Sequence, residues 1–262
     1  MLESVRTMQT YIKVFLVFSL LTSFMLMPFL SKTFAVIDNF THAAISETFG
    51  WTSWGGCQAD EPSYLAKYNK YKTFEPDTVH SLHIVTFHFS GPFTMPQSET
   101  RRTYYSLSGF PSNVYDGGYR QSYYIGETEI NASGIRSIHK LEMYLSKSIA
   151  GSTLSFSGSV KNLETHVFNG YMLVFITENQ LVDSRYPAIQ WNFIFRDYGL
   201  NKTLSLASLS TDTFSGTWNI PAGVNANNIQ VIAAVYDTDT RHPTKGWPYA
   251  VQSVCNVCGH SV

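Results

Sequence analysis

The residues best suited to covalent chemistry are three cysteines, Cys57, Cys255 and Cys258. Cys57 lies in WTSWGGCQADEP, residues 51–62, where glycines and tryptophans surround one sulfur. A thiolate attacks a disulfide and a second thiol resolves the product, so the redox cycle needs two sulfurs. In an oxidising compartment the three cysteines permit the single pairings 57–255, 57–258 and 255–258. Cys57 is therefore a candidate catalytic thiol, a candidate structural disulfide partner or a small buried apolar residue.

The C-terminal sequence SVCNVCGHSV also offers metal ligands. Cys255, Cys258 and His260 supply three ligands of the kinds that zinc prefers, and a fourth could come from Cys57 or another histidine. This spacing is incomplete as a zinc signature, and Gly259 excludes the CxxCH pattern of haem attachment. We therefore expect no cofactor, with zinc at the tail as an alternative.

The N-terminus carries an apolar segment. Arg6 and Lys13 precede VFLVFSLLTSFMLMPFL, Val14–Leu30, which has no charge, and Thr33-Phe34-Ala35 offers small residues for a signal peptidase. Its length lies between a secretory core and a full membrane span, so a cleaved signal and an uncleaved anchor both remain open. With basic residues ahead of the segment, the remainder is expected outside the cytoplasm, membrane-anchored or secreted. The sequons at Asn39, Asn131 and Asn201 are candidate glycosylation sites there.

Composition excludes some partners. The 262 residues are 44% hydrophobic and 14% charged, which predicts a sizeable folded core. The formal net charge is −1, and lysines and arginines are not clustered, so we expect no nucleic-acid partner.

Apolar spacing changes near Gly151. Before it, helical and strand-like patterns alternate; after it, short alternating segments and turn residues predict an antiparallel sandwich. Asp116-Gly117 is a hairpin signal. The segments expected to be helical are Ala59–Tyr71, Gln97–Leu107 and residues 135–149, and Ser81–Phe89 is expected to be a strand buried on both faces. We divide the chain into a leader at 1–35 and domains at 36–150 and 151–262.

The segment SETFGWTSWGGCQADEPSYLAKY, residues 46–68, resembles the strand, CxxC loop and helix of thioredoxin-like proteins. In this resemblance Pro62 places Cys57 at the second, resolving position, and Trp54 replaces the nucleophilic cysteine. LSGFPSNVYDG, residues 107–117, is similar to the family's Gly-x-Pro segment, which implies a cis peptide at Pro111 facing the active-site loop.

More narrowly, the chain after the leader resembles exported and outer-membrane proteins in which a thioredoxin-like half precedes an immunoglobulin-like half. VIDNFTHAAISETFGW, FHFSGP, FPSNVYDGG and NIQVIAAVYDTDT carry this resemblance through their order and spacing. It implies an α/β thioredoxin-like domain followed by an all-β immunoglobulin-like sandwich.

These observations predict an exported or membrane-tethered protein with a non-catalytic binding or structural role. Its groove, formed by Trp54, Cys57, Phe110 and Pro111, would hold an exported protein or peptide. One alternative is a thiol–disulfide oxidoreductase that uses Cys57 with Cys255, Cys258 or a partner's thiol. A second alternative is a metal-binding module at the tail.

Overall fold

A computed structural model describes residues 31–32, 40–71 and 81–256. Residues 31–262 form one compact unit, and residues 1–30, which contain the predicted apolar leader, lie outside the described part. Among the described residues, no helix is both long and apolar enough to cross a membrane. The membrane span predicted for residues 14–30 and the leader predicted for residues 1–35 therefore stay predictions.

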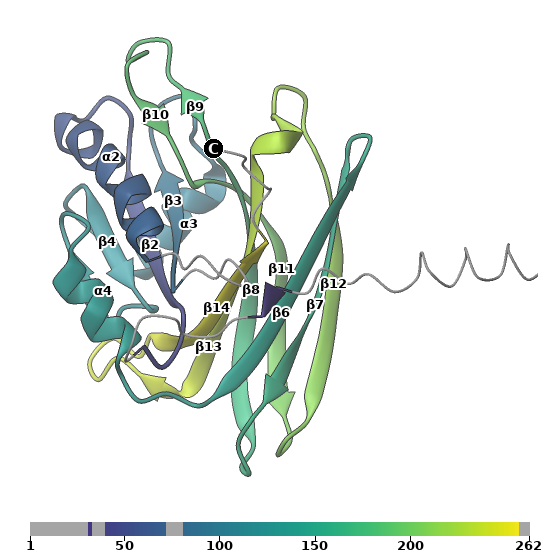
Figure 1. Cartoon of the computed structure of the whole chain (residues 1–262). Coiled ribbons are helices and arrows are strands. Elements are labelled where there is room, and N and C mark those ends of the chain that lie inside the picture. Colours follow the sequence, from purple (N-terminus) through teal and green to yellow (C-terminus); the bar gives the residue numbers. More distant parts are fainter. Residues whose placement is uncertain (1–30, 33–39, 72–80, 257–262) are drawn as a thin grey trace, which may run out of the picture. The chain divides into compact units, whose positions relative to one another are not determined.

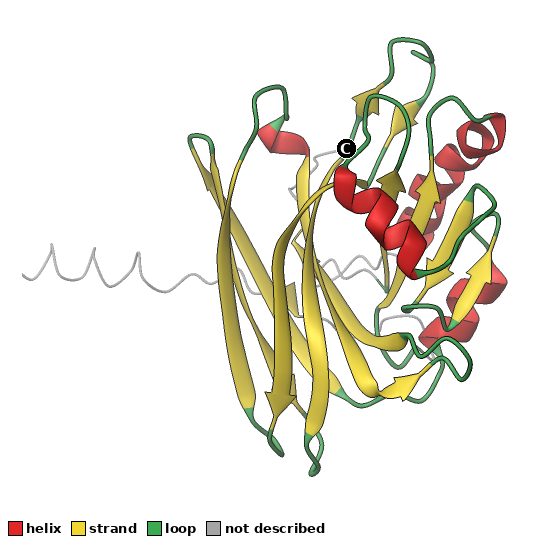
Figure 2. Ribbon diagram, turned by 180° about the vertical axis from the view of Figure 1, so that it is seen from behind, coloured by secondary structure: helices red, strands yellow, loops and turns green. Residues whose placement is uncertain are grey.

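Two large sheets, a two-stranded sheet and three α-helices make up the described fold (Figures 1 and 2). In spatial order, the eight-stranded mixed sheet consists of β14 (Pro248–Asn256), β13 (Ile229–Arg241), β8 (Phe168–Glu178), β11 (Ile194–Leu206), β3 (Leu82–His88), β2 (Ala44–Gly50), β4 (Ser112–Tyr115) and β5 (Arg120–Ser122). The four-stranded antiparallel sheet consists of β1 (Ser31–Lys32), β6 (Leu141–Ala150), β7 (Thr153–Asn162) and β12 (Thr211–Asn219). The remaining elements are the β9 (Leu181–Val182) and β10 (Gln190–Trp191) pair, α2 (Gly55–Lys70), α3 (Pro96–Tyr104), α4 (Glu127–Gly134) and a short 3₁₀ helix at Ala226–Asn228.

The middle of the large sheet is buried on both faces, and β8 and β13 contribute apolar runs to it. In β8, Met172, Val174 and Ile176 join the core shared with the four-stranded sheet. The alternate residues Leu173 and Phe175 join a second core on the opposite face. Successive side chains of a strand point to opposite faces, so one apolar run serves both cores.

Helices cover the other end of the large sheet. Tyr64 and Tyr68 of α2 and Ile130 of α4 pack with Leu82 and Ile84 of β3 in a third core, so α2 and α4 lie against the same face of the sheet (Figure 1). We call strands β2–β5 with α2, α3 and α4 the helix-flanked half. Strands β8, β11, β13 and β14 with the four-stranded sheet are the sandwich half.

Buried ion pairs connect elements within the helix-flanked half. Glu47 of β2 accepts two hydrogen bonds from Arg101 of α3, Nε to Oε2 at 2.5 Å and Nη2 to Oε1 at 2.7 Å. Asp116, in the β4–β5 turn, lies 2.9 Å from His42 Nε2 and 3.3 Å from Arg136 Nε. An ion buried without its partner is strongly unfavourable. The Glu47–Arg101 pair therefore fixes α3 against β2, and Asp116 fixes the β4–β5 turn against the segments that carry His42 and Arg136.

The predicted fold class, a thioredoxin-like α/β domain followed by a separate immunoglobulin-like sandwich, is wrong. The described residues are mostly β, and a single mixed sheet joins strands from both halves of the sequence. β11 pairs with β3 in parallel at Ile194 and Thr86, and the rings of Phe87 and Phe195 pack at 4.7 Å between centroids. The strands of the sequence's second half therefore extend the first half's sheet, because both of their faces are apolar.

The local predictions have mixed outcomes. Helices α2 and α3, the doubly buried strand β3 and the turn at Asp116-Gly117 are confirmed. The helix predicted for residues 135–149 is wrong, since Leu141–Ala150 is β6 and pairs with β7 along its length. Residues 141–146 alternate between buried and half-buried, which is the period of a strand. Gly151, where we placed a domain boundary, lies in the turn between these two strands.

Candidate functional site

The loop after β2 leads into α2 and positions the first candidate residues. Trp54 has an extended backbone at the N-cap position, and its carbonyl accepts the main-chain N–H of Gln58. Cys57 is the third residue of α2 and is 4% exposed. A Cβ atom at Gly50 would lie 2.6 Å from the Cys57 sulfur, so the absent side chain of Gly50 leaves the space that the thiol fills.

The environment of Cys57 opposes thiolate formation. Burial raises the pKa of its thiol to about 11, and a hydrogen bond from the main chain of Trp51 offsets only part of this effect. About one such thiol in 10⁴ is ionised at pH 7, and the thiolate is the reactive form. The described geometry therefore makes Cys57 a packing residue in its present conformation.

Three of the four predicted groove residues come together. A Cβ atom at Gly56 would lie 3.1 Å from the indole Nε1 of Trp54 and 3.2 Å from Cδ of Pro111. Trp54 and Pro111 therefore both lie close to Gly56, where a side chain would crowd them. The peptide between Phe110 and Pro111 is cis, as the sequence predicted. Trp54 is 50% exposed, whereas the fourth predicted residue, Cys57, is buried behind the others.

An aromatic cluster supports the same loop from inside. The Phe110 ring lies 5.2 Å from that of Trp51 and 4.3 Å from that of Phe89, measured between centroids. The guanidinium of Arg102 stacks over Phe89 and Phe110 at 5.7 and 6.0 Å. These contacts fix the position of the loop that precedes β4.

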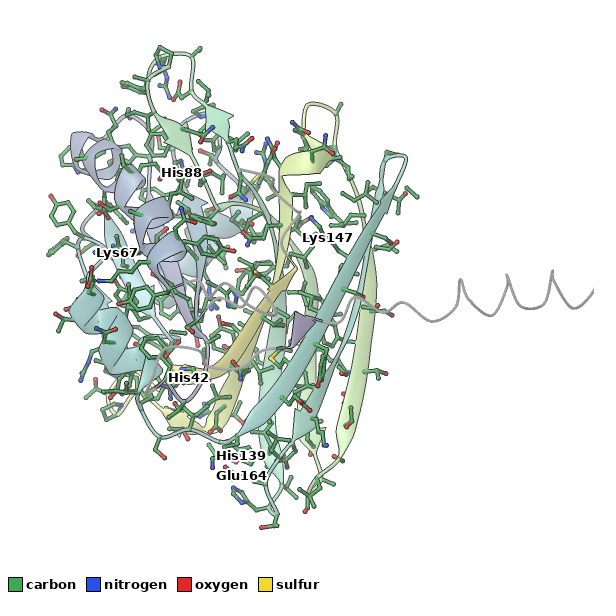
Figure 3. The ribbon with its side chains drawn as sticks, viewed as in Figure 1. His42, Lys67, His88, His139, Lys147 and Glu164 are labelled. Atoms are coloured by element: carbon green, nitrogen blue, oxygen red, sulfur yellow. The ribbon has the colours of Figure 1, made fainter. Side chains whose placement is uncertain are left out.

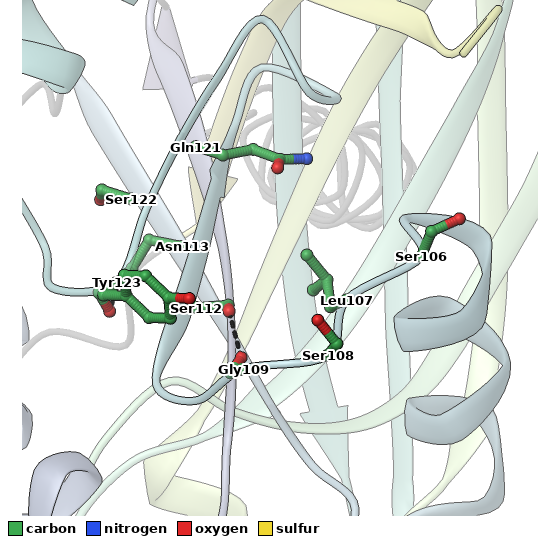
Figure 4. A pocket seen from close by; sticks show the side chains of 9 residues that line it. All are labelled: Ser106, Leu107, Ser108, Gly109, Ser112, Asn113, Gln121, Ser122 and Tyr123. Carbon is green, nitrogen blue, oxygen red and sulfur yellow. Dashed lines mark hydrogen bonds between the residues drawn. The ribbon is translucent and has the colours of Figure 1, made fainter.

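A pocket of about 270 Å³ opens between this loop and β5 (Figure 4). Its lining is mostly hydroxyl and amide groups: Ser106, Leu107, Ser108, Gly109, Ser112, Asn113, Gln121, Ser122 and Tyr123. The Ser112 hydroxyl donates to the Gly109 carbonyl, which closes the loop at its base (Figure 4). Tyr123 is 65% exposed and lies against Gly109, where a Cβ atom would meet its ring.

The edge of β5 leaves hydrogen-bonding capacity at the pocket, whereas the Asn113 side chain is buried at its base. Asn113 donates its Nδ2 to the Tyr123 carbonyl at 2.9 Å, and its Oδ1 has no partner among the described residues. β5 is the last strand of the large sheet, with its inner side paired to β4 and its outer side at the edge. An edge strand presents main-chain N–H and C=O groups to an incoming chain. The loop was predicted from the sequence, but β5 and Tyr123 were not. The signal available for them was the Tyr123-Tyr124 pair that follows the predicted Asp116-Gly117 turn.

The cysteines lie apart in the described structure. Cys57 and Cys255 are both free thiols. The Cys255 sulfur lies 3.6 Å from the Tyr68 hydroxyl and 3.4 Å from Gln230 Nε2, near the C-terminal end of α2. Cys57 lies in the first turn of that helix, eleven residues before Tyr68, which corresponds to about 16 Å along the helix axis. A disulfide requires Cα atoms within about 7 Å, so a bridge between Cys57 and Cys255 has no support in this geometry.

The predicted tail zinc site is described only in part. Cys258 and His260 lie outside the described residues, so pairings and metal sites that include them stay predictions. Burial raises the pKa of the Cys255 thiol to about 11, which disfavours the thiolate that would bind zinc. Asn39 also lies outside the described residues, whereas Asn131 and Asn201 are exposed sequons on α4 and β11.

Comparisons with known proteins give no family. No family model and no curated protein matches this sequence. A calcium-binding mutant of Bacteroides uniformis beta-glucuronidase 2 is 16% identical, with a TM-score of 0.29, and the match covers 43% of this chain and 12% of that chain. A beta-glucosidase from Listeria innocua in complex with isofagomine is 8% identical, with a TM-score of 0.22, and covers 42% of this chain and 16% of that chain.

Similarities this weak, over so small a part of the matched enzymes, carry no argument about activity. They are to glycoside hydrolases and not to thioredoxin-like proteins. The predicted membership of the thioredoxin-like superfamily is therefore wrong, in line with the single mixed sheet that replaces the expected two domains.

Proposed function

We propose that this chain is a non-catalytic binding protein that holds an extended segment of an exported peptide or protein. The segment lies along the outer edge of β5 and inserts a side chain into the pocket beside Tyr123. Trp54 and the Phe110–Pro111 loop form the neighbouring wall. The observation that carries the proposal is a polar pocket of about 270 Å³ at the free edge of the main sheet.

The chemistry of the edge favours a peptide. Main-chain groups of an edge strand give affinity to an added strand, and a pocket for alternate side chains gives specificity. Serine hydroxyls and Gln121 supply donors and acceptors for a polar side chain, and Tyr123 adds a broad apolar surface with little loss of conformational freedom. Burying these groups under a ligand requires that each be paired, so the pocket selects for hydrogen-bonding ligands.

The alternative of a thiol–disulfide oxidoreductase has less support. Cys57 is buried, its pKa is raised to about 11, and the neighbouring pocket is lined by hydroxyls and amides instead of sulfur. A binding role uses the exposed aromatic residues and needs no thiolate. We propose that the protein does this work outside the cytoplasm, tethered or secreted, on the strength of the apolar segment Val14–Leu30 and its preceding basic residues.

A phage-displayed library of random 12-residue peptides, selected on the full chain, tests the proposal. We expect selected peptides to compete with one another, and Tyr123→Ala to weaken their affinity by about 10- to 30-fold because a central aromatic contact is lost. Cys57→Ala should leave the affinity unchanged, since the thiol does not face the pocket.

Tyr186→Ala, in the loop between β9 and β10, is the matched control for loss of a surface tyrosine, and should bind as the wild type does. Peptides that bind Tyr123→Ala and Gln121→Ala with wild-type affinity would overturn the proposed site. Peptide binding that is lost in Cys57→Ala and accompanied by a mixed disulfide in the wild type would instead support the oxidoreductase.

A further inference from the structure

A second group of chemically active side chains lies at the far end of the sandwich half. His139 precedes β6, and Glu164 and His166 lie in the loop between β7 and β8 (Figure 3). One ligand atom from each of the three lies within 4.8 Å of the other two. Glu164 and His166 are two positions apart, and the β6–β7 pairing, with Leu141 opposite Asn162, brings His139 to them.

Asn162, a fully buried residue at the end of β7, fixes the proton on His139. Its Nδ2 is surrounded by three carbonyl oxygens, those of His166 at 2.7 Å, Ala207 at 3.1 Å and Leu206 at 3.3 Å, which orients the amide. Its Oδ1 therefore accepts, and the His139 Nε2 at 2.8 Å must be the donor. In the neutral ring this leaves the lone pair on Nδ1 of His139.

Hydrogen bonds also fix the position of Glu164 and its carboxylate. The Lys140 main-chain N–H donates to Oε1 at 3.0 Å, and the Glu164 N–H donates to Asn162 Oδ1 at 2.9 Å. The other oxygen, Oε2, is thereby turned toward the two histidines, 3.8 Å from Nδ1 of His139 and 3.1 Å from Nε2 of His166. In the neutral form of the His139 ring, the lone pair of Nδ1 faces the Glu164 Oε2 at 3.8 Å, so two potential metal ligands point toward one space.

We propose that His139, Glu164 and His166 form a Zn²⁺ site. A tetrahedral zinc ion with ligands at about 2.0–2.1 Å separates its ligands by about 3.3–3.4 Å. The two separations above, 3.1 and 3.8 Å, lie on either side of that value, so small side-chain movements close the site. Two imidazoles and one carboxylate suit zinc better than Ca²⁺ or Mg²⁺, which prefer oxygen ligands.

The surroundings match those of known zinc ligands. The hydrogen bond from His139 Nε2 to Asn162 is the outer contact that orients a metal-bound histidine. The ring of His139 is also packed 5.0 Å from Phe168, whereas the His166 side chain is 67% exposed and faces solvent. With three protein ligands the fourth position is open on that side, and the ion links the β7–β8 loop to the start of β6.

Zinc titration of the full, untagged chain against a chromogenic chelator tests this proposal. We expect one tight equivalent, an affinity at least 10-fold weaker in His166→Gln and Glu164→Gln, and no competition from a large excess of Mg²⁺ or Ca²⁺. His166 is exposed, so its variant should fold, which circular dichroism verifies.

Two histidine controls locate the site. His242→Gln removes a partly exposed histidine of the loop before β14, and His260→Gln removes the tail ligand that the sequence suggested. Both should retain the tight equivalent. Equal zinc affinity in the wild type, His166→Gln and Glu164→Gln, or a loss confined to His260→Gln, would overturn the assignment and leave the three residues as an ionic cluster of imidazolium and carboxylate.

Discussion

Strands β2–β5 and strands β8, β11 and β13 belong to one sheet, yet the groups buried against them differ. The helix-flanked half buries charge, including the Glu47–Arg101 pair and Asp116 with His42 and Arg136. In the sandwich half the cluster between the two sheets is aliphatic and aromatic, and buried charge is represented by Glu178 of β8 with its partner Arg196 of β11. Apolar packing tolerates compensating changes of similar volume, whereas a buried ion depends on one partner. We therefore expect the two halves to respond differently to substitution and to pH.

The largest effect is expected from Arg101→Met in the helix-flanked half. Glu47 is fully buried and would lose its two hydrogen bonds from the guanidinium, so the free energy of unfolding should fall by about 3–5 kcal/mol. Urea denaturation measures the change. Lys202→Met, which breaks the partly exposed pair with Asp212 on the sandwich half, should lower it by at most about 1 kcal/mol. Equal losses in the two variants would show that the buried pair contributes no more to the free energy of unfolding than an exposed pair does.

In the sandwich half, Leu145→Ala should lower the free energy of unfolding by about 3 kcal/mol. Leu145 is fully buried between the sheets, and its truncation leaves a cavity in addition to the lost apolar burial. The loss should be the same at pH 5.5 and about pH 7.5, since the truncated leucine side chain and the core cluster it belongs to are apolar. Leu209→Ala, at an exposed position, serves as the control and should change stability by at most about 0.5 kcal/mol. A loss in Leu145→Ala that varied strongly with pH would contradict the contrast between the halves.

Glu61 of α2 should make the helix-flanked half sensitive to pH near neutrality. Burial raises the pKa of its carboxyl to about 8, and the Asn192 main-chain N–H, 2.6 Å from Oε1, offsets part of this. Glutamate in an unfolded chain ionises near pH 4.3. Between these values the folded state keeps a proton that the unfolded state releases. Through Glu61, stability should therefore fall as pH rises, by about 1.4 kcal/mol per pH unit. Burial lowers the pKa of His88 in β3 to about 3, so this histidine contributes the opposite slope below about pH 6.5.

Replacing the carboxyl checks this expectation. Glu61→Gln should remove the contribution of Glu61, so the difference in stability between wild type and variant should change by roughly 3 kcal/mol between about pH 5.5 and 7.5. Urea denaturation of the wild type and the variant across this range measures it, with the partly exposed Glu129→Gln as the matched control. A wild-type slope that survives in Glu61→Gln would mean that another group titrates.

The sequence predicted those features that depend on near neighbours. SLHIVTFHF predicted a strand buried on both faces, and Asp116-Gly117 predicted the turn that opens β5. Ile138, Leu141 and Leu145 misled the helix prediction because three- and four-residue spacing also occurs in a strand, where Leu141, Met143 and Leu145 are the buried set. Within this one segment the two periods overlap, and pairing with β7 decides between them.

Features that depend on distant pairing could not be read from the chain. The single sheet rests on β11 lying parallel to β3, between residues more than a hundred positions apart. Trp54, Phe110 and Pro111 were predicted together because each lies in a distinctive local segment. His139 and Glu164 carry no such signal, since only the register of β6 on β7 brings them together.

The central claim is that the free edge of the helix-flanked half binds an extended peptide, and hydrogen exchange with a selected peptide bound tests it most directly. We expect slower amide exchange in residues 106–124, which span the loop, the pocket and β5, because strand addition engages the edge amides. Residues 139–168 at the far end of the sandwich half should exchange at unchanged rates. Protection confined to that second segment, or none in residues 106–124, would contradict the account.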